Sequence, residues 1–223
     1  MALPRAEFIP DGVLEARALR LLHEHETQKG KITTLPVPVE KIVSATLGLA
    51  IEYTDEFDAW ESPGDTVLAC VDPSYRGRPT VLMNMRHAAH FERYFGTEQF
   101  SLAHEGGHWV LHFHRGTVPN QLTLDGVGQE SPAGPVLCRE LGTRDSREFQ
   151  AERFAAYLLL PEHLLRPAIA GLDLTRPSVM TALARDSGVS KSAMCKRLAQ
   201  LGLIVLGPQG QVVLPTPWTG AML

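Results

Sequence analysis

The spacing of apolar residues predicts a chain built mainly from helices. Apolar positions recur every three or four residues, as on one face of an α-helix, over long stretches. Asp11 precedes the first of these stretches and is expected to cap it. The predicted helices cover residues 11–30, 38–48, 87–95, 100–112, 146–160 and 176–201, with a turn at Gly188-Val189-Ser190 inside the last.

Shorter stretches show alternating apolar and polar residues, or a short continuous run of apolar residues, as is typical of β-strands. Residues 66–72 and 80–85 flank a turn-rich segment and predict an antiparallel pair, and residues 49–55 alternate like a further strand. We expect strand 80–85 to present an edge to which an extended peptide can add. Residues 203–206 and 211–214 predict a hairpin that, after the last two helices, makes a helix-turn-helix with a wing.

Residues 115–145 are rich in glycine and proline and show no sustained periodicity. A loop of this length inside a domain is usually functional, so it is a candidate substrate-selecting or autoinhibitory element. Cys138 lies in it; a thiol there can cap a metal, although a structural thiol is the simpler interpretation.

Composition limits the class of protein. The 223 residues are 44% hydrophobic, with a formal net charge of −4 and three cysteines. The charge gives no field that attracts nucleic acid, and the odd, widely spaced cysteines favour a reducing compartment. No stretch suits a secretory signal or a membrane span, so we expect a cytoplasmic protein. The predicted division is an N-terminal helix and linker (1–37), a catalytic domain (38–170) and a C-terminal segment with a tail (171–223).

The most informative motif is His104-Glu105-Gly106-Gly107-His108. Residues four apart in a helix lie on one face about 6 Å apart, so His104 and His108 can bind one zinc ion (Zn2+). Glu105 is then placed to take a proton from the attacking water. The alternative is an apolar helix that carries two unrelated histidines.

Such a zinc site needs a third protein ligand. His112 lies about 12 Å along the helix from His104, too far to share one ion with both motif histidines. His114 could reach the same ion only if the helix broke at position 111, where this chain has Leu111. Both are therefore expected to be structural or surface histidines.

Two glutamates in the helix 146–160 are better candidates. Glu148 and Glu152 lie one turn apart on a face that continues into Ala155 and Ala156. Buried carboxylates need a cation or a donor, so Glu148 is assigned as the third ligand and Glu152 as an acceptor for the outer nitrogen of a ligand histidine. The alternative is a capping box, in which Glu148 bonds the backbone where the helix begins.

The blocks FSLAHEGGHWVLH and REFQAERFAAYLLLP together resemble the ImmA/IrrE family of bacterial zinc metallopeptidases, over about residues 38–205. The resemblance implies a small α+β zincin-like domain of the glutamate type, with a short antiparallel sheet packed on the motif helix. It also implies zinc ligands His104, His108 and Glu148 and the base Glu105. The chain departs from the family pattern at Gly106, where a bulky apolar residue is usual and a looser helix is expected, at Glu152 and at Leu160.

The family's known members imply the function. They cleave a partner repressor of the helix-turn-helix type, so the resemblance implies a regulatory endopeptidase in a stress, prophage or mobile-element switch. Tyr94 and Tyr157 are weak candidates for stabilising the oxyanion. One alternative is a winged-helix DNA-binding protein that uses residues 176–214, and another is an inactive module of a toxin–antitoxin pair.

Overall fold

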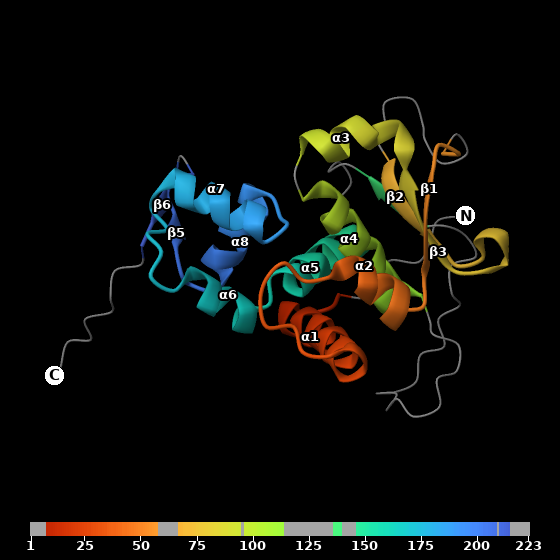
Figure 1. Cartoon of the computed structure of the whole chain (residues 1–223), viewed down its shortest axis with the longest axis horizontal. Helices are drawn as coiled ribbons and strands as arrows, with labels where there is room; N and C mark the ends of the chain where they lie inside the picture. Colours follow the sequence, from red (N-terminus) through yellow and green to blue (C-terminus); the bar gives the residue numbers. More distant parts are fainter. Residues whose placement is uncertain are drawn as a thin grey trace.

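The computed structural model describes residues 8–57, 67–94, 96–113, 146–208 and 210–214, and the backbone of residues 136–139. Two helices, α4 (Thr97–His112) and α5 (Ser146–Leu159), lie at the centre (Figure 1). A small sheet lies on one side of them, and the C-terminal helices lie on the other. The other helical elements described before α4 are α1 (Asp11–Lys29), α2 (Val39–Lys41), the π-helix η1 (Ile42–Thr46), the short turns η2 (Tyr75–Gly77) and η3 (Met85–His87), and α3 (Ala88–Arg93).

The first predicted helix is confirmed as α1, but Asp11 does not cap it. The residue before the helix is Pro10, which makes no side-chain capping bond. Asp11 lies in the first turn, where its carboxylate forms an ion pair with Arg153 of α5. This contact joins α1 to the central helix that carries Glu148.

The sheet is mixed, which corrects the prediction of an antiparallel sheet. Its strands are β1 (Ala50–Thr54), β2 (Val67–Asp72), β3 (Thr80–Asn84) and β4 (Val136–Arg139), in the order β1-β3-β2-β4. The predicted antiparallel pairing of β2 with β3 is confirmed. However, β1 runs parallel to β3, because β2 comes between them in the chain and runs in the opposite direction to both, so the chain reverses twice.

Two further expectations about the sheet were wrong. Strand β4 lies inside the segment 115–145 that was predicted to be a loop, and it pairs with β2. Strand β3 lies between β1 and β2, so its backbone is already paired on both sides. It therefore offers no edge to a substrate.

The hydrophobic core lies between the helices and one face of the sheet. Leu102 and Ala103 of α4 and Phe154 and Ala155 of α5 are fully buried in it. Helix α4 packs on β2 and β4, while α1 covers the other side of α5. The two helices that carry the motif residues are thus held from both sides.

The C-terminal segment contains α6 (Glu162–Ile169), α7 (Pro177–Asp186), α8 (Lys191–Gln200) and the hairpin of β5 (Val205–Leu206) and β6 (Val212–Val213). Its buried side chains, among them Val189 and Leu198, extend the same apolar core. The turn before α8 meets the start of α4: a Cβ on Gly96 would lie 2.7 Å from Cα of Val189. The boundaries predicted at residues 37 and 170 stay predictions.

Within the described residues, none of the helices combines the length and the apolar character that crossing a membrane requires.

Candidate metal centre

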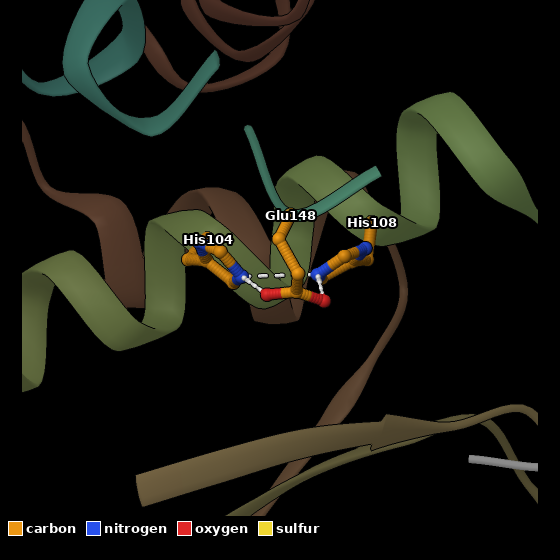
Figure 2. Close-up of side chains that lie close together, drawn as sticks. All are labelled: His104, His108 and Glu148. Atoms are coloured by element: carbon orange, nitrogen blue, oxygen red, sulfur yellow. Dashed lines mark hydrogen bonds and ion pairs between the residues drawn. The ribbon is translucent and has the colours of Figure 1, made fainter. Parts of the chain in front are cut away.

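Three side chains from two helices converge on one point (Figure 2). Nε2 of His104 lies 2.9 Å from Nε2 of His108. The two carboxylate oxygens of Glu148 divide between the histidines, with Oε2 3.2 Å from Nε2 of His104 and Oε1 3.2 Å from Nε2 of His108. Each residue offers a ligand atom within 4.8 Å of the others, which is close enough for one metal ion.

The helices explain this convergence. His104 and His108 are one turn apart on the face of α4 that meets α5, and Glu148 lies in the first turn of α5. Both histidines are buried, and the Glu148 side chain is 23% exposed. Both Glu148 oxygens face the histidines, as the ligand assignment requires. The capping-box alternative pairs Glu148 with Asp145, which lies outside the described residues.

The environment favours an ionised Glu148. Burial raises the pKa of its carboxyl. The hydrogen bonds with His104 and His108 together have the larger effect and lower this pKa to about 2. A positive ion among two imidazole nitrogens and one carboxylate, all largely removed from water, compensates the buried negative charge. Nitrogen and carboxylate donors of this kind suit zinc and related transition metals, so the residues present fit a bound metal ion.

Glu105 is fully buried beside His104. It lies close enough to Cys70 of β2 to affect that thiol: burial raises the pKa of Cys70, and the charge of Glu105 raises it further. The carboxylate therefore lies on the side of α4 that faces the sheet, next to a neutral thiol.

Glu152 lies beside a lysine. One of its carboxylate oxygens lies 4.0 Å from Nζ of Lys196 in α8. Nδ1 of His104 is buried and has no hydrogen-bond partner among the described residues, so Glu152 does not accept a bond from it. The predicted role of Glu152 stays a prediction.

His112 is structural, as its helix position suggested. Its Nε2 donates to the carbonyl oxygen of Arg147 over 3.3 Å, which ties the end of α4 to the residue before Glu148. Burial lowers the pKa of His112 to about 3, so the imidazole is neutral. The only sign of this contact in the sequence is the spacing of one turn between His108 and His112. His114 and the side chain of Cys138 lie outside the described residues.

Of the two tyrosine candidates, Tyr157 points away from the centre. Tyr157 follows Glu148 by nine residues, which places it about 180° around α5. Its ring lies under the guanidinium of Arg197, 4.7 Å from the ring centroid. Tyr94 ends α3 and is half exposed, with its ring against His90.

Residues 136–199 match the family model of the IrrE N-terminal-like domain, the M78 peptidases. The predicted family resemblance is confirmed. The matched M78 segment contains Glu148 and all of α5, whereas the HEGGH motif precedes it. An M78 peptidase is a metallopeptidase, which agrees with the convergence of His104, His108 and Glu148. The comparisons with curated proteins and with solved structures found no match.

Proposed function

We propose that this protein is a zinc-dependent endopeptidase with His104, His108 and Glu148 as metal ligands and Glu105 as general base. The convergence of three ligand atoms beside a buried glutamate is the observation that carries the proposal. When bound, zinc supplies Lewis-acid polarisation of the substrate carbonyl and of the attacking water.

The protein residues contribute position and proton transfer. His104, His108 and Glu148 fix the site at the junction of α4 and α5. The Glu105 carboxylate accepts a proton from the attacking water and then donates it to the nitrogen of the leaving amine. Because Glu105 is fully buried, competing bulk water is kept from its oxygens.

The sheet suggests how a peptide is held. Since β3 is interior, β1 and β4 are the outer strands among those that the structure describes, and α4 packs against β4. We propose that an extended substrate adds to the outer edge of β4, where main-chain hydrogen bonds place its scissile bond near the metal ligands.

The substrate class follows from the family resemblance. The resemblance to the ImmA/IrrE family implies that the substrate is a repressor of the helix-turn-helix type. We propose that it is cleaved at one site, in a stress, prophage or mobile-element switch. An endopeptidase that takes an unfolded segment of such a protein fits a site built beside a strand edge.

DNA binding through residues 176–214 has less support. In α8, Arg197 is 2% exposed, where its Nε donates to the Leu160 carbonyl oxygen over 3.0 Å. Lys196 approaches Glu152 of α5. Arg197 thus binds groups inside the protein and Lys196 lies beside a carboxylate, whereas a helix that reads DNA presents its basic side chains to phosphates.

The test of the peptidase proposal is Glu105→Gln, which keeps the size of the side chain and removes the base. We expect cleavage of a candidate helix-turn-helix repressor, followed by mass spectrometry, to slow about 10²–10⁴-fold while the zinc content is unchanged. Glu40→Gln, at an exposed glutamate of α2, is the matched control and should cleave at the parent rate. An undiminished rate in Glu105→Gln would remove Glu105 from the mechanism.

A further inference from the structure

The two helices that carry the metal ligands touch at Gly107. A Cβ added there would lie 3.1 Å from Cδ1 of Phe154, 3.3 Å from the carbonyl oxygen of Ala151 and 3.4 Å from its Cα. Two of these three atoms are backbone atoms of α5, and the Phe154 ring is fully buried. The close approach therefore depends on the missing side chain, since neither the backbone nor the packed ring can turn aside.

This contact lies within one helical turn of every metal ligand. Gly107 precedes His108 directly and follows His104 by three residues. On α5, Ala151 follows Glu148 by three residues, so the two share a face. Any change in the spacing of α4 and α5 at Gly107 is thus transmitted directly to the distance between Glu148 and the histidines.

We infer that Gly107 is a positioning residue: the absence of its side chain sets the spacing at which Glu148 reaches both histidines. The inference rests on the proposed zinc site. A methyl group at Gly107 forces α5 away by a few tenths of an ångström, and zinc tolerates errors of only about 0.2 Å in its ligand distances.

The neighbouring glycine has a different environment. A Cβ on Gly106 would lie 3.4 Å from Cδ1 of Leu47 and 3.5 Å from Cγ2 of Val43, which are ordinary van der Waals distances to side chains. The looser helix expected at Gly106 stays a prediction. Gly106 accepts a methyl group, and Gly107 does not.

The test compares Gly107→Ala with Gly106→Ala in the full chain. Zinc is removed and titrated back against a competing chromophoric chelator, and the thermal unfolding of the metal-free proteins is recorded. We expect zinc affinity to fall roughly tenfold or more in Gly107→Ala. In Gly106→Ala the affinity should stay within about twofold and Tm should rise by roughly 2–4 °C, because alanine is the better helix former.

If Gly107→Ala does not fold, a double variant that combines Gly107→Ala with Phe154→Leu is compared with the single variant Phe154→Leu. The Ala151 carbonyl contact remains there, so the double variant should still bind zinc several-fold more weakly. Parent-like affinity in a folded Gly107→Ala, or equal losses in both glycine variants, overturns the inference alone. Failure of the parent protein to bind zinc overturns the proposed function as well.

Discussion

At the scale of single residues, helix geometry predicted most of the site. The spacing of His104 and His108 fixed both imidazoles on one face, and the apolar flanks indicated that this face is buried. Glu148 was predicted to be the third ligand from its position on a buried face of its own helix. Its carboxylate oxygens lie 3.2 Å from Nε2 of His104 and 3.2 Å from Nε2 of His108. Glu152 was harder to interpret, because a turn along the same helix does not reveal that Lys196 lies beside it.

The two glutamates give a direct test at this scale. Glu148→Ala removes one of three ligands, so we expect zinc affinity to fall by more than about 100-fold in a chelator competition. Glu152→Ala removes a carboxylate that pairs with Lys196 at 36% side-chain exposure, and its zinc affinity should remain close to that of the parent. A loss of 10–100-fold in Glu152→Ala would instead restore its predicted role beside a histidine.

At the scale of elements, the sequence predicted the helices better than the sheet. The periodicity of apolar residues along the chain predicts helices such as α1 and α5, but it does not predict which strands pair with one another. The parallel pairing of β1 with β3 joins segments that are 30 residues apart, and β4 has only four residues in a stretch without periodicity. Gly106 and Gly107 are neighbours in the motif, and the sequence could not show that Gly107 is the one that faces α5. The comparison of Gly107→Ala with Gly106→Ala tests that contact.

At the scale of the whole molecule, polar contacts tie the C-terminal segment to the catalytic helices. Arg197 of α8 donates to the Leu160 carbonyl oxygen at the end of α5 and to Glu15 of α1, over the ring of Tyr157. The sequence suggested that α8 is a basic recognition helix, because a sequence shows which residues are charged but not which of them are buried. The structure shows that this arginine joins three helices.

This arrangement predicts a large stability effect at Arg197. Arg197→Met should lower the free energy of unfolding by about 1–3 kcal/mol, because the Leu160 carbonyl loses its buried partner. Urea denaturation measures it. Lys191→Met, at an exposed position of the same helix, is the control and should change the free energy by less than about 0.5 kcal/mol. Equal effects at both positions would show that Arg197 does not hold the segment in place.

The central claim is that His104, His108 and Glu148 bind one zinc ion. Anomalous diffraction at the zinc edge from crystals of the zinc-loaded protein tests it most directly. We predict one strong peak at ~2.0–2.2 Å from Nε2 of His104, Nε2 of His108 and a carboxylate oxygen of Glu148. A zinc ion bound elsewhere with these three side chains unligated, or no peak at full zinc loading, would contradict the account.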